Sequence, residues 1–153
     1  MIERVPPQNI EAEQAVIGGM LIEKEAISKV AEFLKADDFY REAHRLIFEA
    51  MLELFNKNEA VDLVTVTEVL RKTDKLEAVG GIAYITSLAN SVPTAANINY
   101  HGKIVEEKAL LRGLINSATH IASMGYEDTE AVADIIDKAE KMILEVSERK
   151  MSG

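Results

Sequence analysis

The chain has 153 residues, of which 48% are hydrophobic and 28% charged, and its formal net charge is −9. This apolar content predicts a packed core in one domain or two small ones, and it excludes an intrinsically disordered chain. The absence of cysteine excludes disulfide scaffolds, thiolate catalysis and cysteine-ligated zinc. The acidic balance disfavours broad binding to nucleic-acid phosphates, which needs clustered cations.

The amino-acid order also argues against membrane insertion and secretion. Residues 78–102 contain no Asp, Glu, Lys or Arg, but a glycine pair and Pro93 interrupt them, so they do not predict a spanning helix. The first residues lack the apolar run of a signal peptide. We therefore expect a cytoplasmic protein.

The first half of the chain repeats its apolar residues at helical spacing. Asn9 is a candidate N-cap, and Glu11 and Glu13 follow in the first turn, where the helix dipole favours carboxylates. The pattern predicts one helix from there to Leu21 and a second over residues 27–34. A third is expected to be capped by Asp37 or Asp38 and to end at residues 56–58.

Residues 61–70, VDLVTVTEVL, are ambiguous because they are rich in β-branched side chains. A strand needs a partner and no second candidate strand exists, so we predict a short helix with an extended or capped entry around Asp62. Thr65 and Glu68 have the spacing of a capping box. A turn ending at the Gly80-Gly81 pair and a helix stopped by Pro93 are expected to follow.

After Pro93 the pattern predicts two long helices. Thr94 can cap a helix of about 30 residues that ends with Gly125 in the C′ position, and a second helix runs over residues 128–149. A connection of about three residues makes an αα-hairpin. The predicted fold is all-α: a small helical bundle over residues 1–93, the globular head, and a long αα-hairpin over residues 94–150.

The motifs of common catalytic sites are missing from the sequence. No GxxxxGK[ST] occurs, which excludes nucleotide hydrolysis by a P-loop in these residues, and GxGxxG, HExxH and GxSxG are absent too. His44 has no metal-ligand partner at helical spacing and is assigned a structural or surface role. His101 and His120 are too far apart on one helix to share a metal. The Asp37-Asp38 pair is typical of a helix cap, so we expect no catalytic residue, cofactor or metal.

The first hairpin helix carries more apolar residues than one helix–helix seam requires. Residues 113–126, GLINSATHIASMGY, contain no Asp, Glu, Lys or Arg. A stretch that lacks charged residues but contains Ile, Met and Tyr is typical of an interface core. The alternative is that the surplus packs on the chain's own bundle. If it serves self-association, the residues expected to carry it are Ile104, Leu110, Leu111 and Leu114.

Several stretches of the chain together resemble one family. They are PPQNIEAEQAV at 6–16, DFYREAH at 38–44, VDLVTVTEVL at 61–70 and GGIAYITSLANSVPTAANINYHGKIVEEKALLR at 80–112. The resemblance, from about Val5 to Lys150, is to the N-terminal domain of bacterial replicative hexameric DNA helicases of the DnaB type. It implies that ATP and Mg²⁺ belong to a RecA-like motor domain that would follow Gly153, so this fragment is not expected to be an enzyme.

The resemblance also implies partners. In the family, heads and hairpins pair as a trimer of dimers that forms a collar on the hexamer, and the collar receives the C-terminal helicase-binding domain of primase. By family position, Glu11, Tyr84, Ile115 and Ile121 are the residues tied to primase binding or its coupling. The first interpretation is therefore an assembly and primase-docking module of the primosome.

Two other function classes stay open. A helical enzyme using carboxylates is disfavoured because no paired acids stand near a base. A helical nucleic-acid-binding domain would use Lys103, Lys108 and Arg112, but Glu106 and Glu107 interrupt that stripe. Little or no DNA binding by the fragment alone is expected, and a salt titration of DNA affinity would separate the classes.

Overall fold

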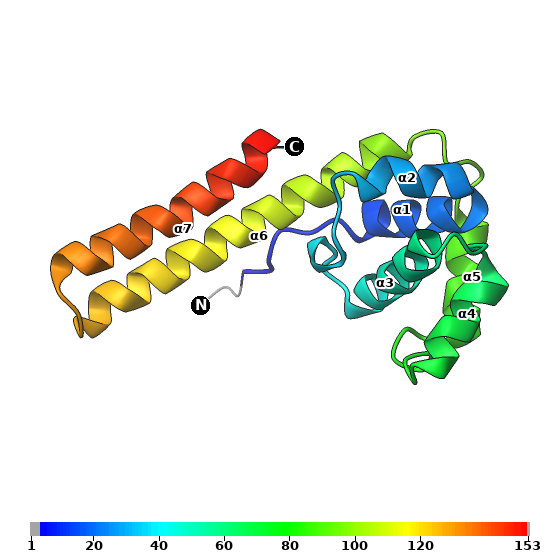
Figure 1. The fold of residues 1–153 in the computed structure, drawn as a ribbon, viewed down its shortest axis with the longest axis horizontal. Coiled ribbons are helices and arrows are strands. Elements are labelled where there is room, and N and C mark those ends of the chain that lie inside the picture. The colour runs from blue at the N-terminus through cyan, green and yellow to red at the C-terminus, as the bar shows by residue number, and fades with distance from the viewer. Residues whose placement is uncertain (1–3, 153) are drawn as a thin grey trace. The chain divides into compact units, whose positions relative to one another are not determined.

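A computed structural model describes residues 4–152, and every regular element among them is helical (Figure 1). The predicted all-α class is therefore confirmed. The chain divides into two compact units. Residues 8–107 form the head unit, and residues 108 onward, together with the segment that ends at Pro7, form the hairpin unit. None of the helices among the described residues is long and apolar enough to cross a membrane.

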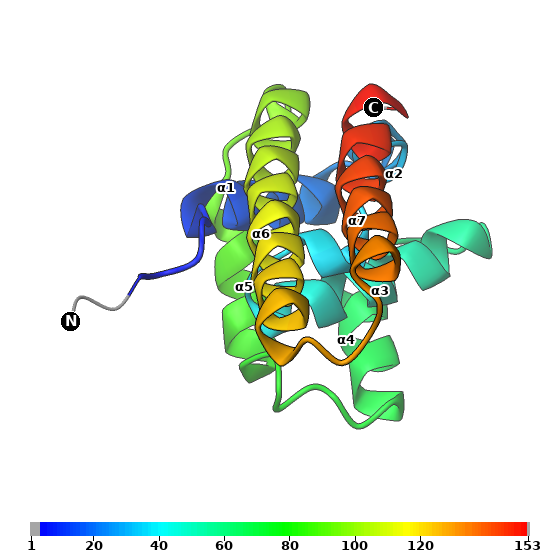
Figure 2. The ribbon, with the colours of Figure 1, turned by 90° about the vertical axis from the view of Figure 1, so that its left-hand side faces the viewer.

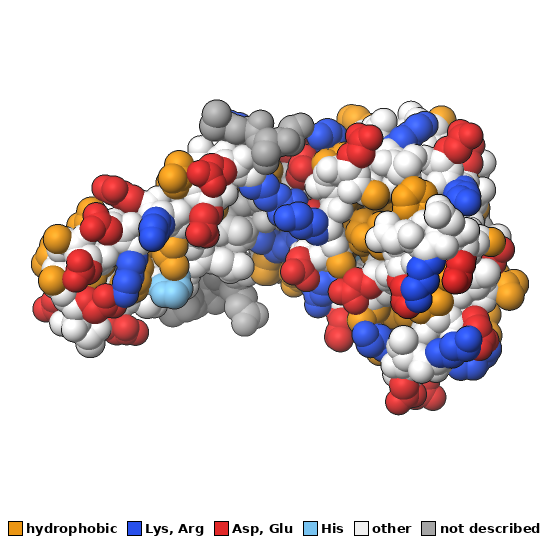
Figure 3. Space-filling view, in the orientation of Figure 1, with side chains coloured by type: hydrophobic (Ala, Val, Ile, Leu, Met, Phe, Trp, Pro, Cys, Tyr) orange, Lys and Arg blue, Asp and Glu red, His pale blue; other side chains and the backbone are white. Residues whose placement is uncertain are grey.

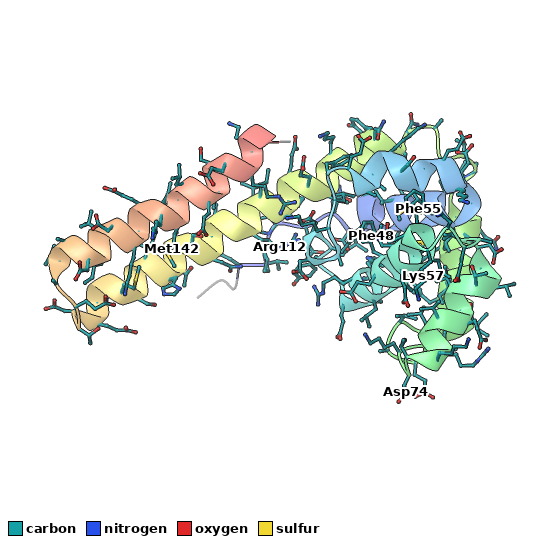
Figure 4. All side chains as sticks on the ribbon, in the orientation of Figure 1. Phe48, Phe55, Lys57, Asp74, Arg112 and Met142 are labelled. Atoms are coloured by element: carbon teal, nitrogen blue, oxygen red, sulfur yellow. The ribbon has the colours of Figure 1, made fainter. Side chains whose placement is uncertain are left out.

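The helices of the head unit surround one hydrophobic core. In chain order the helical elements are α1 (Ile10–Ile22), α2 (Lys24–Ala31), the 3₁₀ turn η1 (Ala36–Asp38), α3 (Glu42–Asn56), α4 (Leu63–Lys72), α5 (Gly81–Ser91) and the first part of α6 (Ile98–Glu127). Val16, Ile17 and Met20 of α1 are completely buried, as are Phe39 and Phe48. Phe48 and Phe55 both lie on α3 in Figure 4.

The predicted division at residue 93 differs from the division into compact units. The first turns of α6 belong to the head unit because Ile98, Gly102 and Val105 are buried there. Gly102 allows this packing, since a Cβ at its position would lie 2.8 Å from Cζ of Phe33. One continuous helix thus supplies residues to both units.

The helix α1 begins as predicted and packs very closely on α5. The Asn9 side chain accepts a hydrogen bond from the backbone N–H of Ala12 at 2.9 Å. Further along α1, Gly18 has no room for a side chain: a Cβ would lie 2.4 Å from the carbonyl oxygen of Leu88 on α5. The glycine therefore permits the backbones of α1 and α5 to approach each other.

The predicted cap of the third helix was wrong. Asp38 belongs to η1, where its carboxylate accepts from the backbone N–H of Lys35 at 2.8 Å. The helix α3 begins only at Glu42, with Arg41 as the cap residue and no side-chain cap hydrogen bond. A buried Phe39 between the acids and the helix explains the shift, because it holds the chain extended before α3 starts.

The helix predicted over residues 61–70 is confirmed as α4, with Asp62 at its N-cap. The predicted capping box of Thr65 with Glu68 was wrong. Instead Asp62 accepts from the N–H of Thr65, and the Thr65 hydroxyl accepts from the N–H of Asp62, each at 2.9 Å. Glu68 pairs with Arg71 at 3.0 Å.

Both predicted ends of the long helix were displaced. The Thr94 hydroxyl accepts from the N–H of Ala96, which makes a local turn, and α6 begins four residues later at Ile98. Gly125 lies inside α6 and is not its C′ residue. Asp128 takes the left-handed conformation instead, with φ of 49°, and its N–H bonds to the carbonyl of Met124. The second hairpin helix, α7 (Val132–Ser152), therefore starts later than residue 128.

Candidate interaction sites

The helices of the hairpin unit, α7 and the second part of α6, lie side by side and antiparallel in both ribbon views (Figures 1 and 2). Their facing side chains are half-buried and recur at three- and four-residue spacing. On α6 this seam contains Leu110, Gly113, Ser117, Ile121 and Met124; on α7 it contains Ile135, Ala139, Met142, Val146 and Arg149. A groove of about 190 Å³ lies along the seam. Figure 4 shows Met142 on α7.

A second apolar stripe on α6 adjoins the seam and faces solvent. Leu111, Leu114 and Ile115 are 45%, 43% and 48% exposed. Ala118 and Ala122 continue the stripe and are exposed as well. At 100° per residue the middle of the stripe lies about a third of a turn from the middle of the seam. This is the apolar surplus that the composition predicted.

The helix α7 has a matching stripe of Val132, Ile136 and Ile143, all exposed. Viewed along the chain direction of its own helix, each stripe is rotated away from the seam in the same sense. Because the two helices are antiparallel, equal displacements bring both stripes onto one broad face of the hairpin. Figure 3 shows hydrophobic side chains exposed among acidic and basic ones along this unit. We name the two stripes together the apolar face.

The hairpin has almost no core of its own. No residue from 106 to 150 is fully buried, whereas the head unit contains completely buried residues from α1 to α6. A free pair of helices cannot bury more than one strip of each. The apolar face therefore remains available to a further helix.

The head unit contains a buried polar cluster at the meeting point of three helices. Glu13 on α1 is 2% exposed and His44 on α3 is 0% exposed. The His44 Nδ1 lies 2.7 Å from Oε1 of Glu13, and its Nε2 lies 2.7 Å from the hydroxyl oxygen of Tyr84 on α5. Glu13 also accepts from the backbone N–H groups of Tyr40 at 2.7 Å and Arg41 at 3.4 Å. A buried carboxylate is tolerated here because several donors satisfy it.

Comparison with known proteins gives one consistent result. Residues 5–107 match the family model described as the DnaB-like helicase N terminal domain, which covers more than half of the chain. The chain belongs to the DnaB-like helicase N-terminal domain family. It is 56% identical to the replicative DNA helicase DnaC of Bacillus subtilis (strain 168) over 97% of this chain and 33% of the relative. It is 44% identical to the replicative DNA helicase DnaB of Mycobacterium leprae (strain TN) over 97% of this chain and 25% of the relative. The chain thus spans about a third or less of these relatives.

Solved structures agree with this DnaB-like assignment. The N-terminal domain of the DnaB helicase from Mycobacterium tuberculosis matches with a TM-score of 0.89 and 43% identity, covering 92% of this chain and 99% of the other. A DnaB-like replicative helicase, solved with its interactions with primase, matches with a TM-score of 0.74 and 30% identity. That match covers 90% of this chain and 31% of the helicase chain.

The residues that the DnaB-type resemblance ties to primase occupy two surfaces. Ile115 is exposed on the apolar face, and Ile121 lies half-buried in the seam of the hairpin. In the head unit, Glu11 is exposed on α1, and Tyr84 is half-buried on α5 with its hydroxyl in the polar cluster. These primase-binding assignments stay predictions.

The residues predicted for self-association lie in three settings within this DnaB-like chain. Leu111 and Leu114 belong to the apolar face, and Leu110 lines the groove along the seam. Ile104 lies in the head unit, where it packs partly against the core. The assignments stay predictions. Of the four residues, Leu111 and Leu114 have the most exposed side chains.

Two of the three cations of the open nucleic-acid alternative, Lys103 and Arg112, make contacts within their own units. The ammonium of Lys103 lies 4.2 Å from the ring centroid of Phe33 and 3.5 Å from the carboxylate of Glu106. The guanidinium of Arg112, labelled in Figure 4, donates to the carbonyl oxygen of Pro7 at 2.8 Å. No group of three or more His, Asp or Glu within the described residues could hold a metal ion.

Sequence reasoning missed Glu13 and the buried setting of His44. A signal was present, because Glu13 lies three, four and seven residues before Val16, Ile17 and Met20, on the apolar side of α1. A carboxylate on an apolar helix face indicates a buried partner. That partner could not be identified from the sequence, since His44 lies on another helix.

Proposed function

We propose that this chain is the assembly and primase-docking module of a bacterial replicative DNA helicase. In the cytoplasmic ring it would form the collar, as a dimer or a trimer of dimers in the hexamer. The chain itself supplies contacts and no catalytic residue. ATP and Mg²⁺ act in the motor domain of the parent enzyme.

The observation that carries this proposal is the apolar face on a hairpin without fully buried residues. Burial of apolar surface contributes roughly 25 cal/mol per Å², so a stripe of Leu and Ile left in water favours association. Closed two-fold pairing is the commonest way for identical subunits to cover such a stripe. A helical partner domain can cover it by the same packing.

Self-association is tested by light scattering over a concentration series of the 153-residue chain. We expect dimers or larger species that dissociate on dilution. Leu114→Glu should shift the distribution to smaller species while the helical circular dichroism stays unchanged. Asn116→Glu is the matched control, because it adds the same charge to an exposed position on the other side of α6. A wild-type chain that is monomeric throughout would overturn the assembly part of the proposal.

Primase docking is tested by calorimetric titration of the C-terminal helicase-binding domain of primase into the chain. Removing an apolar anchor from an interface centre costs about 1–3 kcal/mol, which is roughly a 5- to 150-fold loss of affinity. Ile115→Ala should fall in this range. Ile121→Ala should also weaken binding, because its side chain supports the seam beneath the apolar face.

Thr119→Ala is the control for docking, since Thr119 is exposed and its hydroxyl donates to the carbonyl oxygen of Ile115 within the same helix. Its affinity should match that of the wild type. Circular dichroism and light scattering on each variant separate a lost contact from lost folding or lost assembly. Undiminished affinity in a folded Ile115→Ala and Ile121→Ala double variant would refute docking at this site.

A further inference from the structure

The donors and acceptors of the polar cluster can be assigned for a neutral His44 ring, starting from the carboxylate of Glu13. The side-chain amide of Gln14 donates to the hydroxyl oxygen of Tyr84 at 3.3 Å. The carboxylate of Glu13 can only accept, so Nδ1 of His44 carries a proton and donates to it. On a neutral imidazole this leaves Nε2 to accept the proton of the Tyr84 hydroxyl. The cluster is thus a relay from α5 through α3 to α1.

The ring of Tyr84 is enclosed as well as hydrogen-bonded. It stacks on the imidazole of His44, with 5.9 Å between ring centroids and 15° between the planes. Gly80 lies close beside it, and a Cβ at Gly80 would lie 2.9 Å from Cβ of Tyr84. Gly80 also has φ of 97°, which disfavours any side chain there. These contacts hold Tyr84 with its hydroxyl in the polar cluster, while the residue as a whole is only half-buried.

The relay joins the stretches that carry the family resemblance. Glu13 belongs to residues 6–16, His44 to residues 38–44 and Tyr84 to residues 80–112. We propose that Glu13 and His44 are positioning residues, which hold Tyr84 in the orientation that the primase domain contacts. This inference rests on the proposed function, because it assigns Tyr84 to the docking of primase.

The first arm of the test reads the relay without primase. In Glu13→Gln the amide oxygen must accept from the N–H of Tyr40, so the amide NH₂ faces Nδ1 of His44. The ring proton must then move to Nε2, which reverses the hydrogen bond to Tyr84. Proton–nitrogen correlation NMR of the imidazole rings distinguishes the two tautomers, and His101 and His120 serve as internal references.

We expect the wild-type chain to carry the His44 proton on Nδ1 and the Glu13→Gln variant to carry it on Nε2. Glu11→Gln is the matched control, since it makes the same change at an exposed position on α1 and should leave His44 as in the wild type. The same tautomer in wild type and Glu13→Gln would overturn the relay.

The second arm measures the affinity of the primase domain in a double-mutant cycle. Tyr84→Phe removes only the hydroxyl. His44→Asn is chosen to keep a donor near Glu13 without reaching Tyr84, and circular dichroism checks that the variant folds. Each variant should weaken binding about 3- to 10-fold, the effect of one ordinary hydrogen bond. The double variant should lose no more than either single one, because both changes cut the same link.

Tyr100→Phe is the control, because Tyr100 is 69% exposed in the same unit. Its affinity should be unchanged. Additive losses in the cycle, or unchanged affinity in both folded single variants, would overturn the positioning role even if primase binds. If the wild-type chain binds no primase, both the docking function and the role of Tyr84 in docking are refuted. The NMR experiment tests the relay independently of that result.

Discussion

Replacing Gly18 by alanine tests the close approach of α1 and α5 in the head unit. The new Cβ would lie 2.4 Å from the carbonyl oxygen of Leu88 and 2.6 Å from Cγ2 of Val92. The carbonyl is backbone, so it cannot rotate aside as a side-chain end could. The helices α1 and α5 must separate instead, and this separation would also lengthen the hydrogen bond between Gln14 and Tyr84.

The expected size of the effect follows from two opposing contributions. Overpacking a well-filled site costs about 3 kcal/mol when the backbone has to move. Alanine in a helix interior recovers about 1 kcal/mol relative to glycine. Gly18→Ala should therefore lower the free energy of unfolding of the head unit by about 2 kcal/mol. Gly113→Ala is the matched control: apart from its own stretch of helix, nothing lies within 4 Å of its Cβ position, so it should stabilise α6 by about 1 kcal/mol.

Amide hydrogen exchange resolved along the chain measures both changes in the unit where each occurs. Amides of α1 and α5 should exchange faster in Gly18→Ala, and amides in the second part of α6 should exchange more slowly in Gly113→Ala. Unchanged exchange of α1 in Gly18→Ala would show that α1 and α5 are farther apart than described. The reasoning from close backbone approach would then be wrong.

Three further changes test other elements. Asp62→Ala removes the side-chain cap of α4 and should cost about 1 kcal/mol in urea unfolding, whereas no loss would show that the cap hydrogen bonds contribute nothing net. Asp128→Gly should raise the thermal stability of the hairpin by up to about 1 kcal/mol, since glycine adopts the left-handed φ of 49° without strain; a lower melting temperature would contradict this. Leu111→Glu should reduce self-association in sedimentation experiments as Leu114→Glu does, and wild-type behaviour would limit the interface to other residues of the apolar face.

The helices themselves could be predicted from the sequence because apolar spacing records which side of each helix is buried. The short helix at residues 63–72 was correctly preferred over a strand, since no partner strand was available. The surplus of Leu and Ile on α6 was also predicted, and the structure leaves it exposed. These features depend on local pattern and composition alone.

The helix ends were less predictable because several residues near each end could serve as caps. Asp37 and Asp38 look like caps of the next helix, but the buried Phe39 separates them from it. Gly125 looks like a C′ residue, but helix geometry continues to Glu127 and Asp128 takes the left-handed position. The choice among neighbouring candidates is made by tertiary packing, which the local pattern does not contain.

The polar cluster could not be assembled from the sequence for a similar reason. Glu13, His44 and Tyr84 are separated by about 30 to 40 residues along the chain, and each alone has an ordinary local explanation. Their meeting depends on how α1, α3 and α5 pack. The carboxylate on the apolar side of α1 was the only local sign that such a partner existed.

The lack of a fully buried residue between 106 and 150 has a consequence for the lifetime of an unassembled subunit. Segments with few buried contacts open at low free-energy cost, and a protease cleaves the open form. Any subunit or partner that binds the closed hairpin raises that cost by mass action. Residues 128–131, which join α6 to α7, would therefore be cut first in free chains and spared in assembled ones. If the proposed self-association occurs, proteolytic turnover would remove the chains that have not associated.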